Sequence, residues 1–236
     1  MWKRRLLYLC SMLLLLGGIC KEEVLPADAP AEIPAQGKYI ALTFDDGPRR
    51  ITTSRLLDGL RERGASATFF LIGRQIEENR DLVEQMAADG HQVGNHTWNH
   101  VRLENITQET IAVEIEQTNQ LLREILGDKT YWLRPPYGQL EAPGRAQMTV
   151  PLVKWSIDPE DWAKKNTQEI VQSVLSHAQP NGIILMHDIY PTSVDAALEI
   201  VDLLQADGYT FVTVEELLAL NGIDPQPGVF YLNGNP

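Results

Sequence analysis

Two adjacent carboxylates stand at the first point in the chain where chemistry is expected. Asp45 and Asp46 follow an apolar run at 39–42, which predicts a short buried strand, and Gly47-Pro48 ends it. Neighbouring residues at a strand end point in different directions, so one carboxylate can bind a metal while the other remains free as a base. Asp-Asp-Gly is also a common turn sequence, so this stretch alone leaves a simple turn open.

A pair of histidines supplies candidate metal ligands. His96 and His100 are four residues apart, a spacing that puts two imidazoles on one face of a helical turn. Together with Asp46 they form an Asp-His-His set, and three ligands with an open fourth position are typical of catalytic rather than structural metal sites. We expect zinc, with cobalt or iron as alternatives. Read alone, the pair also fits two surface histidines.

Polar residues also follow three later apolar runs. They lie in Arg134-Pro135-Pro136-Tyr137-Gly138, in Asp161-Trp162 and in Leu185-Met186-His187. Two prolines make a rigid loop that can hold a backbone N–H for an oxyanion, and a histidine can donate a proton to a leaving group. Taken alone, the first segment also fits a rigid surface loop, the second an acidic helix start with one buried tryptophan, and the third a core histidine. His91 and His177 are interpreted as structural or solvent-facing.

Strand and helix patterns alternate along the chain. Strands are expected at 39–42, 67–72, 92–95, 131–134, 151–156, 182–186 and 209–214, and helices at 52–64, 81–89, 107–126, 167–178, 193–206 and 215–220. Consecutive apolar residues in the strands indicate a parallel sheet that is buried on both faces, with helices outside. The first strand is not followed by a glycine-rich phosphate loop, which disfavours a Rossmann fold. We therefore expect an α/β fold, a closed or nearly closed (β/α) barrel of about seven parallel strands, whose functional residues gather at the strands' carboxyl ends.

Composition limits the partners. The 236 residues indicate one domain with a short extension, and the apolar content of 44% is that of a globular protein. A net charge of −12 argues against nucleic acid and against electrostatic binding to anionic lipid. No coiled coil or long apolar edge points to an oligomer, so we expect a monomer.

The N-terminus has the pattern of an export signal. Lys3-Arg4-Arg5 precedes an apolar run that ends at Ile19 and is short for a bilayer span. We expect residues 1–20 to be a signal peptide or a membrane anchor. Cys20 is a candidate for lipidation, although Ile19 stands where a small residue is usual. Both cysteines lie in this segment, so the remaining chain has no disulfide.

The rest of the chain divides into three parts. Residues 21–36 have the proline-rich composition of a linker, residues 37–222 form the expected folded domain, and residues 223–236 form a C-terminal tail rich in Gly, Pro and Asn. An export signal followed by a linker predicts a protein of the bacterial cell envelope or the extracellular space.

The order of the motifs resembles that of the polysaccharide deacetylases, the NodB-homology group of carbohydrate esterases. The motifs are Thr43-Phe44-Asp45-Asp46-Gly47-Pro48, His96-Thr97-x-x-His100, Arg134-Pro135-Pro136-Tyr137-Gly138, Asp161-Trp162 and Leu185-x-His187. The resemblance spans about residues 38–220; the first three motifs match residue for residue and the last two are looser. It implies a distorted (β/α) barrel and a metal-dependent hydrolase that removes acetyl groups from N-acetylated sugars of a polysaccharide. For an exported bacterial protein we expect N-acetylglucosamine of peptidoglycan first and chitin-type oligomers next.

The resemblance also implies the roles of the metal-side residues. Asp45 would be the general base and Arg134 would hold it ionised and oriented. Asp46, His96 and His100 would bind the metal.

The remaining roles concern the leaving group and the sugar. By the same resemblance, His187 would be the general acid and Asp161 would keep it protonated. The backbone N–H of Tyr137 would stabilise the oxyanion, and Trp162 and Leu185 would line the groove for the sugar and its acetyl group.

Two other functions remain open. The same metal and base would serve an O-acetyl esterase that acts on xylan or another O-acetylated glycan, and no residue decides between amide and ester. The chain could also be a catalytically silent carbohydrate-binding barrel, although all five motif positions are intact.

Overall fold

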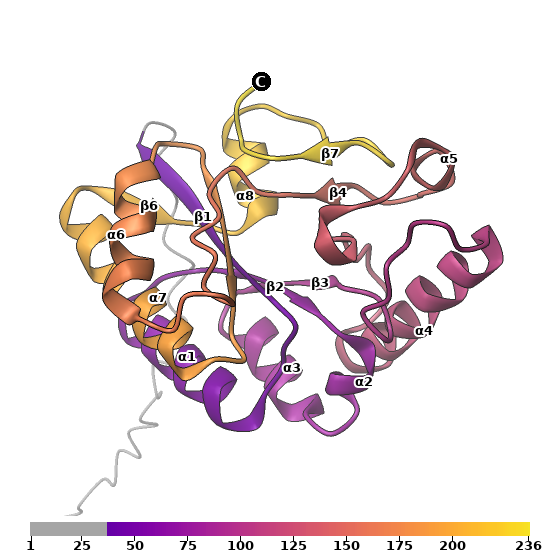
Figure 1. The fold of residues 1–236 in the computed structure, drawn as a ribbon, viewed down its shortest axis with the longest axis horizontal. Helices are drawn as coiled ribbons and strands as arrows, with labels where there is room; N and C mark the ends of the chain where they lie inside the picture. The colour runs from indigo at the N-terminus through magenta and orange to yellow at the C-terminus, as the bar shows by residue number, and fades with distance from the viewer. Residues whose placement is uncertain (1–36) are drawn as a thin grey trace, which may run out of the picture. The chain divides into compact units, whose positions relative to one another are not determined.

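The computed structural model describes residues 37–236 (Figure 1). The expected signal peptide or anchor at 1–20 and the expected linker at 21–36 lie outside the described residues, so the structure does not bear on them. Within 37–236, no helix combines the length and the apolar character needed to cross a bilayer.

A parallel sheet forms the centre of the domain. It contains β1 (Lys38–Asp45), β2 (Thr68–Leu71), β3 (Gln92–Asn95), β5 (Ile183–His187) and β6 (Tyr209–Phe211). Their order is β3-β2-β1-β5, and β6 pairs with the first residues of β1. The register places Asp45 at the end of β1 opposite Phe70 of β2 and His187 of β5. The carboxyl ends of three strands therefore meet where the sequence motifs begin.

A second parallel pair completes the strand arrangement. It consists of β4 (Leu152–Val153) and β7 (Phe230–Tyr231). Single parallel bridges join Asn95 to Leu133 and Leu133 to Leu152, and Ile157 bridges back to Ile184 of β5. The expected α/β fold of parallel strands is confirmed. The pairing between β3, β4 and β5 runs through isolated bridges, so the barrel is distorted rather than a continuous ladder.

Helices pack outside the sheet (Figure 1). They are α1 (Arg50–Glu62), α2 (Gly73–Ile76), α3 (Arg80–Ala88), α4 (Gln108–Leu126), α5 (Ala142–Arg145), α6 (Thr167–His177), α7 (Pro191–Ala206) and α8 (Val214–Leu220), with a 3-10 turn at Pro136–Gly138. The long helix α4 begins at Thr107, whose side chain caps Thr110 N–H, and ends at Gly127 with φ of 87°. In α8, Thr213 and Glu216 form a reciprocal capping box.

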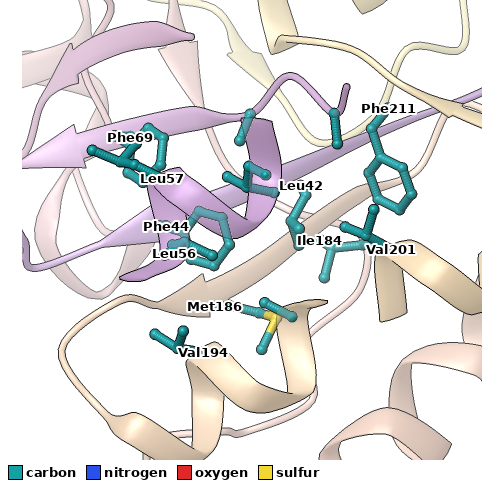
Figure 2. Close-up of a cluster of buried hydrophobic side chains, with 14 of the residues drawn as sticks. Leu42, Phe44, Leu56, Leu57, Phe69, Ile184, Met186, Val194, Val201 and Phe211 are labelled. Carbon is teal, nitrogen blue, oxygen red and sulfur yellow. The ribbon is translucent and has the colours of Figure 1, made fainter. Parts of the chain in front are cut away.

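The two faces of β1 have different neighbours. Leu42 and Phe44 join the main apolar cluster. That cluster also includes Leu56, Leu57, Phe69, Ile184, Met186, Val194, Val201 and Phe211, from β2, β5, β6, α1 and α7 (Figure 2). Thr43 and Asp45 point the other way and both contact the side chain of Arg134. Because side chains alternate along a strand, one segment supplies both the core and the site.

Three expected strands are markedly shorter than predicted. Residues 131–134 contribute only the bridge at Leu133, 151–156 contribute only β4 at Leu152–Val153, and 209–214 contribute only β6 at Tyr209–Phe211. Pro135, Pro136 and Pro151 flank the first two segments, and proline has no N–H to donate to a ladder.

The C-terminal tail includes a strand that the sequence analysis missed. Gly228 N donates to Val150 O at 3.0 Å, Leu152 N to Val229 O at 3.0 Å, Lys154 N to Tyr231 O at 2.8 Å and Gly234 N to Asn181 O at 2.8 Å. The run Val229-Phe230-Tyr231-Leu232 is apolar, but the surrounding Gly, Pro and Asn residues hid it. The tail therefore pairs with the fold instead of only covering its surface.

Deletion of residues 228–236 should lower the stability of the domain. The four backbone hydrogen bonds named above, which join the tail to the rest of the fold, disappear, each worth about 0.5–1.5 kcal/mol. For a domain of this size, about 2–4 °C of Tm is lost per kcal/mol, so the loss of these four bonds should lower Tm by about 4–24 °C in calorimetry. Deletion of residues 235–236 alone keeps all four bonds and serves as the control. Equal Tm values for the two deletions would show that β7 does not stabilise the fold.

Candidate active site

Three side chains at the strand ends converge on one point. The candidate ligand atoms of Asp46, His96 and His100 all lie within 4.8 Å of one another. Asp46 Oδ1 is 3.6 Å from His96 Nε2 and 3.3 Å from His100 Nε2. That oxygen is buried and has no hydrogen-bond partner among the described residues. A buried acceptor without a partner is costly, and a cation between these three groups would satisfy it.

The two imidazoles are arranged to suit a metal. His96 Nδ1 lies 2.6 Å from the carbonyl oxygen of Arg134, a contact that requires a hydrogen on Nδ1 and leaves Nε2 as the atom that faces Asp46. Burial, together with the nearby His96, lowers the pKa of His100, which favours its neutral form. Two imidazoles and one carboxylate fit a divalent cation.

The loop that carries the histidines is not the helical turn that the spacing suggested. Residues 96–100 are irregular, with Thr97 at φ of 67° and His100 at φ of 59°. Side chains hold this shape: Asn95 Oδ1 accepts from Thr97 N at 2.7 Å, and Thr97 Oγ1 accepts from His100 N at 3.1 Å. The rings still approach to 4.9 Å between centroids, so local side-chain bonds do the positioning that a helix was expected to do.

Asp45 is held by a fully buried arginine. Arg134 Nη1 donates to Asp45 Oδ1 at 2.7 Å and to Thr43 Oγ1 at 2.8 Å, and Nη2 donates to Lys154 O at 3.0 Å. The second oxygen of Asp45, Oδ2, remains on the side of the site, 3.6 Å from His96 Nε2. One carboxylate oxygen is thus occupied by the arginine while the other faces the candidate metal ligands.

The two adjacent carboxylates reach the same imidazole. Asp46 has φ of 72°, a left-handed conformation that is rare for a residue other than glycine. This turn brings Asp46 Oδ1, like Asp45 Oδ2, to 3.6 Å from His96 Nε2. The carboxylates differ in their other partners, Arg134 for Asp45 and His100 for Asp46, more than in their direction.

On the opposite side, His187 is paired with a buried carboxylate. His187 Nδ1 lies 2.8 Å from Asp161 Oδ1, and His187 N donates to Asp161 Oδ2 at 2.8 Å. Burial lowers the pKa of His187, but the hydrogen bond and negative charge of Asp161, with the charges of Asp45 and Asp46, outweigh it and raise this pKa to about 9. His187 is therefore protonated at neutral pH.

One cavity of about 550 Å³ joins these groups. It is lined by Asp45, Asp46, His96, His100, Arg102, Tyr137, Trp155, Asp158, Trp162, Leu185 and His187. Tyr137 and Trp162 are 49% and 55% exposed. Arg134 and Asp161 lie behind the lining and contact Asp45 and His187. The structure thus brings together every site residue that the motifs suggested.

Four further residues at the site were not predicted. Arg102, Trp155 and Asp158 line the cavity, and Asp188 is fully buried behind the loop of Asp45 and Asp46. A Cβ on Gly47 would overlap the carboxyl oxygens of Asp188, which explains the glycine there. Burial raises the pKa of Asp188 to about 7. Its place directly after His187 was the available signal, whereas Arg102 had no partner visible in the sequence.

Comparison with known proteins identifies the class. The family model described as "Polysaccharide deacetylase" matches residues 32–149. A peptidoglycan-N-acetylglucosamine deacetylase of Bacillus cereus is 37% identical over 196 residues, which cover 79% of this chain and 91% of the relative. This chain belongs to the polysaccharide deacetylase family.

Individual relatives cover most of the described domain. The peptidoglycan-N-acetylmuramic acid deacetylase PdaC of Bacillus subtilis is 38% identical over 197 residues, or 84% of this chain. The chain spans only 42% of the length of PdaC. A solved structure titled "T48 deacetylase with substrate" has a TM-score of 0.80 and 39% identity, covering 85% of this chain and all of that one.

A second solved structure is an esterase. The family 4 acetyl xylan esterase of Clostridium thermocellum, solved with a cobalt ion, has a TM-score of 0.79 and 28% identity. The match covers 83% of this chain and 98% of the esterase.

Replacement of Asp161 by Asn should lower the pKa of His187. The charge that favours the imidazolium is removed while burial still opposes it, so the pKa should fall from about 9 to near or below the ordinary 6.5. NMR titration of the imidazole in metal-free protein measures this.

The same carboxylate-to-amide change at Asp158, in the same cavity, is the control and should move that pKa little. A pKa that stays near 9 in Asp161→Asn would contradict the pairing. In the parent protein, charging of His187 contributes stability below about pH 6.5, and this contribution is lost as the pH rises through about 9.

Proposed function

We propose that this chain is a metal-dependent hydrolase that removes acetyl groups from N-acetylated sugars of a polysaccharide. N-acetylglucosamine of peptidoglycan is the first candidate substrate and chitin-type oligomers are the second. One observation carries the proposal: a single cavity contains an Asp-His-His set, a carboxylate held by a buried arginine, and a protonated histidine. The chemistry named for the B. cereus relative and for PdaC supports it.

Asp46, His96 and His100 are the proposed ligands of a divalent cation. Their donor atoms suit zinc, and cobalt is the alternative, as in the C. thermocellum esterase structure. A bound divalent ion supplies Lewis acidity, which polarises the acetyl carbonyl and makes water more acidic.

Asp45 is the proposed general base. Arg134 occupies Oδ1, so the free Oδ2 accepts the proton of the water that attacks the acetyl carbon. The buried ion pair fixes the carboxylate before substrate arrives, because Arg134 remains charged throughout the ordinary pH range.

Tyr137 and His187 act on the other atoms of the amide. The backbone N–H of Tyr137, held at φ of 60° after Pro135 and Pro136, is the proposed donor to the carbonyl oxygen as negative charge develops. His187 gives its proton to the sugar nitrogen as the C–N bond breaks, which yields acetate and the amine. Asp161 is hydrogen-bonded to His187 Nδ1, and its negative charge keeps His187 protonated until this transfer.

Two side chains of the cavity wall are the proposed contacts for the sugar. Trp162 and Leu185 line the cavity and are the proposed contacts for the sugar and its acetyl methyl group. We also propose that the protein is exported and acts at the cell envelope or outside the cell. The export pattern of residues 1–20 and the peptidoglycan substrates named for its relatives support this location.

Hydrolysis of O-acetyl esters is the second candidate. The similarity to the acetyl xylan esterase favours it, and the same base and metal ligands would serve an ester. The two candidates differ in the leaving group, an amine or an alcohol.

Acetate release is the test. The purified protein should release acetate from N-acetylglucosamine oligomers or peptidoglycan, lose this activity on chelation and regain it with zinc. Release from acetylated xylan alone would move the assignment to the ester. No release from any of the three, with zinc bound, would refute the proposed reaction.

His96→Ala should lose metal and activity together, because one of three ligands is gone. Bound zinc is measured by elemental analysis beside acetate release. His177→Ala is the control, since His177 is an exposed histidine in α6. Stoichiometric zinc in His96→Ala would contradict the proposed ligand set.

His187→Ala should lower turnover on an N-acetyl substrate by ~10²–10⁴-fold, the usual contribution of a general acid. The zinc content should not change, because His187 is not among the three proposed ligands. Turnover within a few-fold of the parent protein would exclude His187 as the acid.

A further inference from the structure

An arginine that the proposed reaction does not use stands in the cavity. Arg102 lies two residues after His100, and its guanidinium carbon is 3.8 Å from the centroid of the Tyr137 ring. The Tyr137 ring is in turn 5.0 Å from the His100 ring. The neighbouring Leu103 is buried in the second apolar cluster, which fixes the backbone at this point. The stack therefore holds a positive charge at a defined place, one aromatic ring away from a proposed metal ligand.

The guanidinium of Arg102 lacks a close ion pair. Its nearest carboxylate among the described residues, Glu104, lies 3.9 Å away, and its side chain is 59% exposed. The Gln139 amide, turned so that its nitrogen faces Glu104, donates to that carboxylate at 2.7 Å. By contrast, Arg55 and Arg63 contact aspartates at 2.8 Å. Arg102 thus keeps donors free for a carboxylate ligand.

The positive charge of Arg102 stands among side chains that are otherwise mostly acidic or uncharged, and this indicates what kind of ligand it binds. Among the described residues that line the cavity, Arg102 is the only arginine or lysine, beside the carboxylates of Asp45, Asp46 and Asp158. Uncharged sugars need no cation for binding. Planar guanidinium groups are particularly suited to bidentate binding of carboxylates.

We propose that Arg102 forms a carboxylate subsite of this cavity. It favours glycans in which a carboxylate lies within about one sugar of the reacting acetamido group, over uncharged N-acetylglucosamine oligomers. In peptidoglycan this carboxylate is either the lactyl group of N-acetylmuramic acid or a carboxylate of the attached peptide. This inference rests on the proposed function and names its substrate class.

The first experiment compares a ratio of rates. kcat/KM for acetate release is measured on peptide-free glycan strands, which carry free lactyl carboxylates, and on uncharged N-acetylglucosamine oligomers. Arg102→Gln should lower the ratio of the first value to the second by about 10- to 100-fold, mainly through KM, as loss of a hydrogen bond between charged groups predicts. Arg55→Gln, an exposed arginine on α1 with an aspartate partner, is the matched control and should keep the ratio.

Two further arms separate the sources of the carboxylate. Strands whose lactyl carboxylates are converted to amides should behave like the uncharged oligomers with the parent protein, and Arg102→Gln should lose its effect on them. If intact strands with peptides show the Arg102 effect and peptide-free strands do not, the ligand is a peptide carboxylate. An unchanged ratio in Arg102→Gln on both carboxylated substrates would overturn the subsite.

A binding measurement separates this proposal from the proposed reaction. Calorimetric titration of the parent protein and Arg102→Gln with a peptide-free N-acetylmuramic acid disaccharide, and with its amidated form, needs no turnover. Tighter binding of the carboxylated form by the parent protein alone supports the subsite even if no acetate is released. If the two forms bind with equal affinity to both proteins, and a peptide-bearing disaccharide also binds equally to parent and Arg102→Gln, the subsite is overturned even if deacetylation is observed.

Discussion

The buried ion pair between Arg134 and Asp45 is the contact on which the rest of the site depends. Arg134 Nη1 and Asp45 Oδ1 are 2.7 Å apart and the arginine is fully buried, and removal of one partner from a buried ion pair typically costs about 3–5 kcal/mol. The same residue also acts through its backbone. Its carbonyl oxygen orients His96, and its N–H donates to Asn95 O at 3.0 Å. One arginine therefore connects the proposed base, a proposed metal ligand and the strand that leads to that ligand.

Two histidines of the same cavity have pKa values that are shifted in opposite directions. Burial and a neighbouring imidazole lower the pKa of His100, whereas a paired carboxylate raises that of His187 to about 9. Both histidines line one cavity, yet one is suited to bind a cation and the other to donate a proton. Burial lowers both pKa values, so the difference between them comes from the neighbouring side chains, His96 beside His100 and Asp161 beside His187.

Most of the elements, and the residues that the structure gathers at the candidate site, could be predicted from the sequence because both depend on local patterns. Apolar runs marked the strands, and chemically active residues stood at their ends, as with Asp45 at the end of β1 and His187 at the end of β5. Long-range features were out of reach. β7 forms by pairing with β4, which lies far from it in the sequence. Arg102 packs on the ring of Tyr137, which is also distant in sequence. The irregular loop at 96–100 was misjudged because the spacing of two histidines says nothing of the side-chain bonds from Asn95 and Thr97.

Because side chains alternate along β1, the register of that strand decides which residues face the site and which face the core. Phe44 packs into the apolar cluster while Asp45 faces Arg134, so a slip of one position would bury a carboxylate among aliphatic side chains and turn a phenyl ring toward the guanidinium. Single-residue insertions or deletions within 38–45 would therefore abolish the site and the core together. By contrast, Glu141 and Ala142 are exposed. Length variation in this fold is thus expected to concentrate in such loops, and a library that varies chain length should leave β1 untouched.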